Sequence, residues 1–171
     1  MKDKSTTFTQ NDLQGFLDEM IDHDRLALAD RLQRASERLA EYAPLVTAGH
    51  GDHGWSAHEV LAHIVVLSKF YGVIFHKVSS GKMTELDLLN NVGLRDAMDE
   101  QMAQIEPKEL IRMALEDHAR TIKGLRAADA ASMRRVVKVD GGETMTAEEV
   151  ARLPLISHLE LHVDQLARAL A

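Results

Sequence analysis

Residues 56–75 read SAHEVLAHIVVLSKFYGVIF. The segment opens with Ser56 and, three residues later, Glu59, which is the pattern of a capping box at the start of a helix. Apolar residues then occupy most sides of that helix, whereas a surface helix keeps one polar face. The sequence therefore predicts a helix that begins near Ser56, ends near Gly81 and is buried on several sides. Such a helix requires other helices around it.

Three further segments carry apolar residues at the spacing of three and four that is typical of amphipathic helices. The first begins at Thr9, a suitable N-cap, and stops before Pro44; the second begins at Pro107 and ends near Ala127. The third opens with a capping box at Thr146, continues close to Ala171 and should be kinked or interrupted at Pro154. We therefore predict an all-α protein, a four-helix bundle formed by one domain over residues 1–171.

Two connections between these helices carry some structure of their own. Residues 83–104 show only a weak helical pattern, so we expect a long crossover connection with one short helix. Residues 135–145 alternate around a pair of glycines, which predicts a small β-hairpin or extended loop before the last helix. We expect this hairpin to be no more than an appendage.

The composition excludes several classes of protein. A net charge of −7 disfavours nucleic acid or an anionic membrane surface as a partner. The chain has no cysteine, so any metal must be held by nitrogen or oxygen ligands. No apolar signal core appears at the N-terminus, and no stretch was expected to approach the roughly 18 apolar residues that cross a bilayer. We expect a soluble, cytoplasmic protein.

Three histidines are expected to face the interior of the bundle. His63 has apolar neighbours three and four residues away, so its ring should be neutral and should need a hydrogen-bond partner or a metal. His158 and His162 are one helical turn apart at the edge of the apolar stripe of the last helix. Histidines on two facing helices can hold one divalent ion and leave a position open, which is the catalytic pattern. The alternative is that each ring is a core residue satisfied by protein hydrogen bonds alone.

The segments Trp55-Ser-Ala-His-Glu-Val-Leu-Ala-His63 and His158-Leu-Glu-Leu-His162-Val-Asp-Gln-Leu166 together resemble the paired signature of the DinB/YfiT-like family. The resemblance spans nearly the whole chain, including the helix order and the long connection. It implies a four-helix bundle, commonly dimeric, with a divalent metal bound by three histidines. Those ligands fall on His63, His158 and His162.

The leading functional prediction is a metal-dependent enzyme. The ion would be zinc or nickel, with manganese or iron as alternatives. Characterised relatives include enzymes that act with low-molecular-weight thiols, so the resemblance implies a thiol-dependent transferase or isomerase, or a hydrolase. Its substrate would be a small molecule, with such a thiol as one candidate, and the protein would be a homodimer. The competing prediction is a stress-associated metal-binding or interaction protein without turnover. No residue identifies itself as a general base.

Other residues near these motifs have structural interpretations. Trp55 should pack against Val60 or Leu61 as a hydrophobic staple, and Glu59 could either cap its helix or orient a ligand. Gln165 is expected to be a polar residue at a helix edge. Five of the six remaining histidines are expected in solvated loops, in a first helical turn, at the edge of the core or at the surface: His23, His50, His53, His58 and His118.

Overall fold

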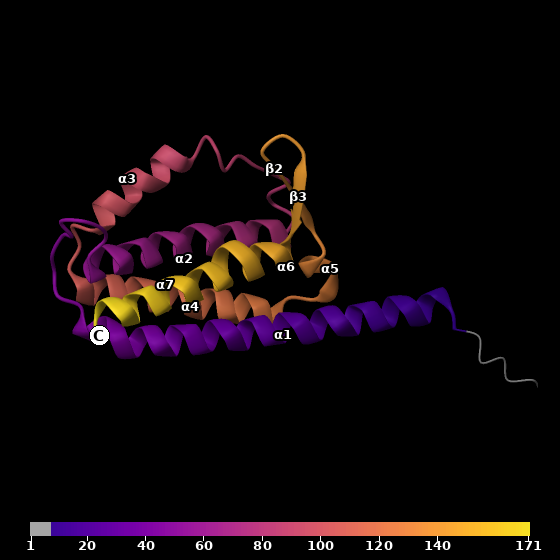
Figure 1. The fold of residues 1–171 in the computed structure, drawn as a ribbon. Coiled ribbons are helices and arrows are strands. Elements are labelled where there is room, and N and C mark those ends of the chain that lie inside the picture. The colour runs from indigo at the N-terminus through magenta and orange to yellow at the C-terminus, as the bar shows by residue number, and fades with distance from the viewer. Residues whose placement is uncertain (1–7) are drawn as a thin grey trace, which may run out of the picture.

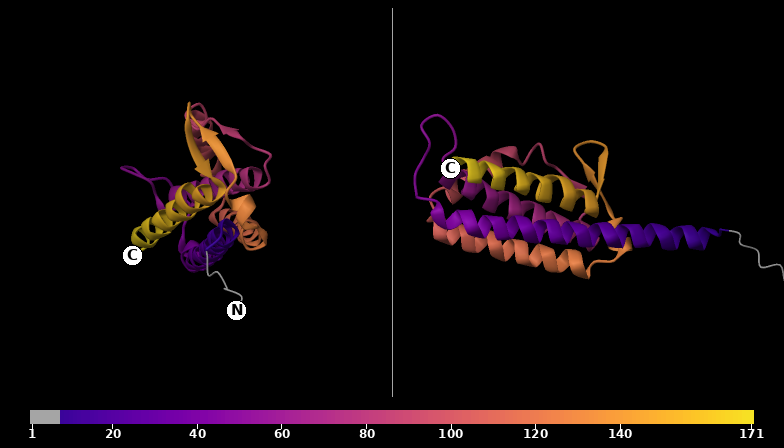
Figure 2. Two further views of the ribbon diagram at one scale, coloured as in Figure 1. Left: turned by 90° about the vertical axis from the view of Figure 1, so that its right-hand side faces the viewer. Right: turned by 60° about the horizontal axis from the view of Figure 1, so that its bottom comes forward.

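The computed structural model describes residues 8–171, and the absence of a signal core was predicted largely from residues 1–7, which lie outside that range. Four long helical segments run side by side along one direction in two different views (Figures 1 and 2). They are α1 (Gln10–Tyr42), α2 (Ala57–Ser79), α4 (Pro107–Ala127) and a C-terminal segment made of α6 (Ala147–Val150), a π-helical stretch (Ala151–Ser157) and α7 (His158–Ala169). The predicted four-helix bundle is confirmed.

The helix starts follow from local chemistry. The side chains of Thr9, Ser56 and Thr146 each accept a hydrogen bond from the backbone N–H three residues later, and an acidic side chain at that position bonds back. Each reciprocal pair satisfies backbone donors that have no partner inside the helix. Pro107 begins α4, where its missing N–H removes no helical hydrogen bond.

Helix α2 is the central element of the core. Its buried residues lie on several sides, and Leu61, Ile64 and Phe75 are fully buried. By length and composition α2 could cross a membrane, which corrects the expectation that no segment approaches such a composition. However, 72% of its most apolar window is buried within the bundle, so contacts with the other helices explain its apolar character.

The connection between α2 and α4 runs from one end of the bundle to the other. It contains β1 (Glu85–Leu86) and α3 (Val92–Met102), and α3 lies against α2. The single short helix predicted in this connection is therefore present. Two small helical turns complete the path: Ala43–Leu45 after α1, and α5 (Ala130–Met133) after α4.

The predicted hairpin is present but is more than an appendage. Strands β2 (Val136–Val139) and β3 (Glu143–Thr146) pair antiparallel, and β1 pairs parallel to β2 to give a three-stranded sheet. Val137 is completely buried and belongs to the main core. The hairpin therefore anchors the crossover connection at the end of the bundle away from α3 (Figure 1).

Candidate metal centre

His63, His158 and His162 converge between α2 and α7. One nitrogen from each ring lies within 4.8 Å of the corresponding nitrogens of the other two. Ring centroids are 4.6 Å apart for His63 and His162, 5.5 Å for His63 and His158, and 4.7 Å for His158 and His162. The structure thus brings together all three histidines singled out in the sequence.

Each imidazole has an oxygen atom beside its Nδ1 atom. The Nδ1 of His63 lies 2.9 Å from Oδ2 of Asp99 on α3, and the Nδ1 of His162 lies 2.8 Å from Oε1 of Gln165. The Nδ1 of His158 lies 3.2 Å from the carbonyl oxygen of Pro154. These oxygens accept hydrogen bonds, so in the neutral rings the proton belongs on Nδ1 and the lone pair on Nε2.

The donor set fits a divalent metal. Within residues 8–171, no hydrogen bond to Nε2 of His63, His158 or His162 is present. Three imidazole lone pairs are therefore held close together by outer hydrogen bonds, which is how metal-ligating histidines are usually oriented. Core histidines satisfied only by protein groups would not need this convergence.

Burial favours the neutral rings that metal binding requires. Loss of solvent lowers the pKa of both His158 and His162 below the ordinary imidazole value, and the neighbouring His63 lowers it further in each case. Both groups are therefore neutral and available as ligands at pH 7.

The π-helical stretch explains the environment of His158. In an α-helix the Pro154 carbonyl would accept the backbone N–H of His158. Here that N–H is directed to the carbonyls of Leu153 and Leu155, and Pro154 provides no N–H of its own. The Pro154 carbonyl is consequently available to the imidazole. The predicted interruption at Pro154 is thus present, as a local widening of the helix.

Trp55 lies over the histidines. Its ring centroid is 4.8 Å from that of His63 and 6.1 Å from that of His162, and the residue is 50% exposed. The predicted staple did not include these contacts with the imidazoles of α2 and α7. The indole covers one side of the cluster and separates it from solvent there.

Glu59 and Gln165 have different roles. Glu59 accepts backbone hydrogen bonds from Ser56 and Gly51, which lower the pKa of its carboxyl to about 2, so it caps α2. Gln165 is not merely a helix-edge residue, because it orients His162. Asp99 was missed by sequence analysis altogether. The spacing of three between His162 and Gln165 was the one local signal for these outer partners.

Two other histidines differ from expectation. His118 is fully buried and lies 2.8 Å from the Ser68 hydroxyl and 3.0 Å from that of Ser36, so it is a core residue. His58 is also buried, and its ring joins the Gly49 N–H to the Ile105 carbonyl. Both rings hold separate chain segments together. His23, His50 and His53 are exposed, as expected.

A cavity of about 210 Å³ lies directly beside the histidine cluster. His63 and His158 form part of its wall, and the rest is contributed by α2 and α3. A ligand in this cavity would therefore contact both imidazoles. The arrangement provides a substrate-sized space next to the donor set.

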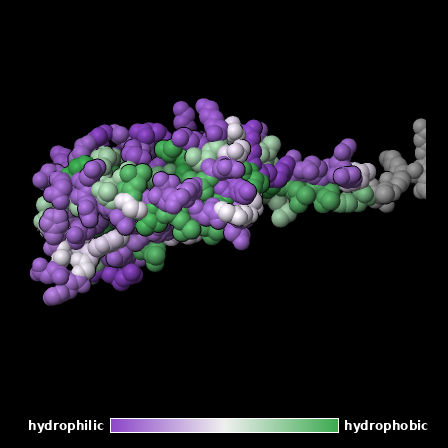
Figure 3. Space-filling view, turned by 90° about the horizontal axis from the view of Figure 1, so that it is seen from above, coloured by the Kyte–Doolittle hydropathy of each residue, from purple (hydrophilic) through white to green (hydrophobic). Residues whose placement is uncertain are grey.

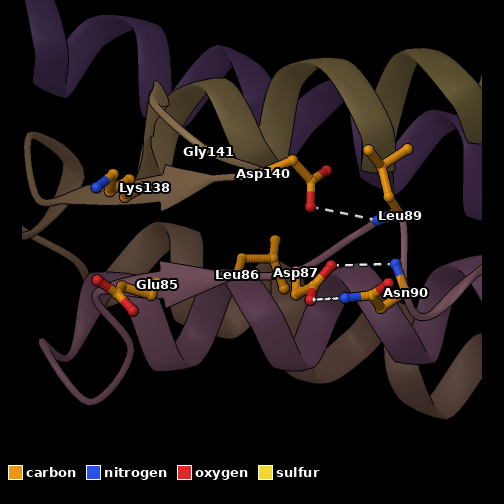
Figure 4. Close-up of a pocket in the computed structure, with 8 residues that line it drawn as sticks. All are labelled: Glu85, Leu86, Asp87, Leu89, Asn90, Lys138, Asp140 and Gly141. Atoms are coloured by element: carbon orange, nitrogen blue, oxygen red, sulfur yellow. Dashed lines mark hydrogen bonds between the residues drawn. The ribbon is translucent and has the colours of Figure 1, made fainter.

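A larger hollow, of about 530 Å³, lies at the sheet and contains none of the three histidines. Figure 4 shows two of its three carboxylates hydrogen-bonded to the chain: Asp140 accepts from the N–H of Leu89, and Asp87 accepts from Asn90. Asp140 also accepts the Leu88 N–H. These bonds fix the loop after β1. Donor chemistry, rather than volume, therefore identifies the histidine cluster as the candidate site.

Comparison with known structures agrees with this architecture. The crystal structure of a mycothiol-dependent maleylpyruvate isomerase superposes with a TM-score of 0.67 at 18% identity, over 85% of this chain and 60% of the isomerase. YfiT from Bacillus subtilis, described as a probable metal-dependent hydrolase with an unusual four-helix bundle topology, superposes with a TM-score of 0.56 at 16% identity, over 95% of this chain and 90% of YfiT. The chain has the DinB/YfiT-like fold.

This DinB-like bundle spans 60% of the length of the isomerase. No family model matches the sequence, and no curated protein matches it either. At these identities the structural similarity establishes the fold, while the chemistry must be argued from the site itself.

Proposed function

We propose that His63, His158 and His162 hold one divalent metal ion and that the protein is a metal-dependent enzyme. The observation that carries the proposal is that the Nδ1 atom of each ring is hydrogen-bonded and, among the described residues, the Nε2 atom is free, while one nitrogen from each ring lies within 4.8 Å of those of the other two. Zinc or nickel suits such an imidazole set best, with manganese or iron as weaker candidates. A metal bound in this way polarises a ligand and lowers the pKa of a bound water or thiol.

The surrounding residues would keep the donor set in place and limit access. Asp99, Gln165 and the Pro154 carbonyl hold the protons of the three rings on Nδ1. Trp55 shields one side, while the adjacent cavity leaves space for a small molecule. A closed structural site would have no such cavity. This contrast favours a catalytic role over the binding-protein alternative.

We propose a low-molecular-weight thiol as the co-substrate, in a transferase or isomerase reaction. The chain has no cysteine, so a sulfur nucleophile would have to be supplied by a second molecule. The structurally similar isomerase is described as mycothiol-dependent, which supports this choice. Hydrolysis is the second candidate, because YfiT is described as a probable metal-dependent hydrolase. The thiol would be required in the first case and dispensable in the second.

The first experiment measures bound metal in protein purified without a histidine tag. We expect about one equivalent in the parent, by analogy with other three-histidine sites, and loss of it in both His63→Ala and His162→Ala. His23→Ala is the matched control, because that side chain is 85% exposed. Folded parent protein that neither contains metal nor takes up zinc, nickel or manganese would overturn the proposal.

Turnover is tested separately with metal-loaded protein. We expect 2-mercaptoethanol and a small panel of electrophiles, including 1-chloro-2,4-dinitrobenzene, to give a thioether product with release of the leaving group. The reaction should be lost in His162→Ala. Product formation without thiol would identify a hydrolase, whereas a metal-loaded protein inactive across the panel with and without thiol would favour the non-catalytic alternative.

We also propose that the protein is a homodimer. Helix α1 extends beyond the other helices (Figure 1), and its first buried residue is Leu28. Four exposed apolar side chains occur on this extension at helical spacing, and Figure 3 shows an apolar surface along it; they are Leu13, Phe16, Leu17 and Met20. In a two-fold pair each copy presents the same stripe, so one contact would cover both.

A further inference from the structure

The cavity beside the histidines is lined by two chemically different kinds of polar group. His63 and His158 form one part of its wall, and Arg95 of α3 forms another. Four apolar side chains also line it: Val66, Leu67, Phe70 and Val92. A molecule that filled this space would contact the histidines with one group and the guanidinium with another.

Arg95 is held in position only by neutral groups. One terminal nitrogen donates to the Tyr71 hydroxyl at 3.1 Å, and the other donates to the Leu88 carbonyl at 3.2 Å. The guanidinium lies over the Phe70 ring, 5.5 Å from its centroid. These contacts fix the plane of the guanidinium without neutralising its charge.

The guanidinium also retains unused hydrogen-bonding capacity. Its Nε atom is buried and makes no hydrogen bond. Arginine has five N–H donors, and only two donate to protein groups here. Since a buried, unpaired donor is costly, the arrangement calls for a partner that the described chain does not supply.

No carboxylate within residues 8–171 forms an ion pair with Arg95. Asp99, one turn along α3, also lines the cavity, but its Oδ2 is bonded to His63. Asp96 lines the cavity too, and that residue is exposed. Arg95 therefore shares the cavity wall with two carboxylates but pairs directly with neither, and Oδ1 of Asp99 is buried there without a hydrogen-bond partner among the described residues.

We propose that Arg95 binds the carboxylate of a small substrate whose reactive part lies at His63, His158 and His162. A volume of about 210 Å³ and one guanidinium suit a singly charged carboxylate with a short apolar body. Arg95 is then the residue that selects acids over neutral analogues. The position of the reactive part rests on the proposed metal centre, whereas binding of the carboxylate does not.

The test uses metal-free protein, benzoate and benzamide, because the two probes share a shape and differ in charge. We expect calorimetry to detect benzoate binding to the parent. In Arg95→Gln, where the charge is lost, the affinity for benzoate should fall by about tenfold or more. Arg95→Lys, which keeps the charge without the planar fork, should be intermediate. Benzamide should bind weakly and equally to all three proteins.

Arg112→Gln is the matched control, because Arg112 is an exposed arginine engaged by Glu109 and Glu116. Circular dichroism and metal content should match the parent in every variant. If Arg95→Gln does not fold, chemical-shift changes on adding benzoate to the parent should still centre on Arg95 and the α3 backbone. Three results would overturn the proposal: equal benzoate affinity in the parent and Arg95→Gln, benzamide binding to the parent as tightly as benzoate, or chemical-shift changes that centre elsewhere.

The two proposals fail independently. A parent protein that takes up metal but does not bind benzoate would reject the role of Arg95 and leave the metal centre intact. Benzoate binding in a chain that takes up no metal would confirm carboxylate recognition and reject the metal-dependent enzyme.

Discussion

Three oxygen atoms of different chemical origin orient the three imidazoles. A carboxylate acts on His63, a peptide carbonyl on His158 and a side-chain amide on His162. Each fixes the proton on Nδ1, so the free energy of metal binding should depend on these partners as well as on the ligands. Gln165 gives the clearest test of this dependence. It lies on the same helix as His162, and its replacement by a neutral residue changes no charge.

We predict that Gln165→Leu weakens zinc affinity about 10- to 100-fold, as is typical for partners of metal ligands. Without the amide oxygen, His162 loses the acceptor that holds its ring and tautomer. Isothermal titration with zinc measures the change, and Arg168→Gln, at an exposed position of α7, is the control. Unchanged affinity in Gln165→Leu would show that helix packing alone orients His162.

His118 gives a prediction about stability and pH. Burial lowers the pKa of its imidazole to about 4 from the ordinary value of 6.5. The unfolded chain therefore binds a proton that the folded chain excludes between these values, so the free energy of unfolding falls as the pH falls from 6.5 to 4. The contribution is about 3 kcal/mol, present in full above pH 6.5 and lost progressively towards pH 4.

Chemical unfolding of metal-free protein across this pH range measures the effect. We expect His118→Gln to show a shallower acid dependence than the parent, and His23→Gln to show none of this change because His23 is exposed. An identical pH slope in parent and His118→Gln would assign the acid sensitivity to other groups.

The ligands could be predicted from the sequence, but most of their partners could not. His158 and His162 are one turn apart, and apolar neighbours directed His63 inward. Asp99 is 36 residues from His63 in a segment of weak helical pattern, and only tertiary packing of α3 brings it there. The position of Arg95 in the cavity wall depends on the same packing of α3. The position of Trp55 beside His162 could not be predicted, because the staple rule considers one helix at a time.

At the scale of elements, predictions succeeded where the signal was local. Capping boxes and Pro107 marked helix starts because the bonds concerned span only a few residues. Strand β1 could not be predicted, since two residues form a strand only when β2 is already beside them. The same long-range pairing explains why the hairpin is part of the core.

The π-helical stretch gives a prediction at this scale. We expect Pro154→Ala to restore an N–H and allow Ala151–Ser157 to relax towards regular α-helix, turning His158 and His162 relative to α6. Zinc affinity should then fall, while the metal-free protein remains at least as stable as the parent in thermal unfolding. Lower stability with unchanged zinc affinity would show that the site does not depend on the π-helical geometry.

At the scale of the whole molecule, the extension of α1 is the surface whose role is most directly testable. We expect light scattering to give twice the chain mass for the parent and the chain mass for the double variant Phe16→Asn and Met20→Asn, because both side chains are exposed on the proposed contact. Leu161→Asn, an exposed site on α7, is the control. A monomeric parent would reject the dimer, and a dimeric double variant would place the contact elsewhere.

The position of Trp55 has a practical consequence. It is the only tryptophan in the chain, and its ring lies against two of the three proposed ligands. Intrinsic fluorescence therefore reports on this single place in the molecule. Nickel or cobalt bound there would quench the emission, and a molecule entering the neighbouring cavity would shift it, so occupancy can be followed in solution without any added label.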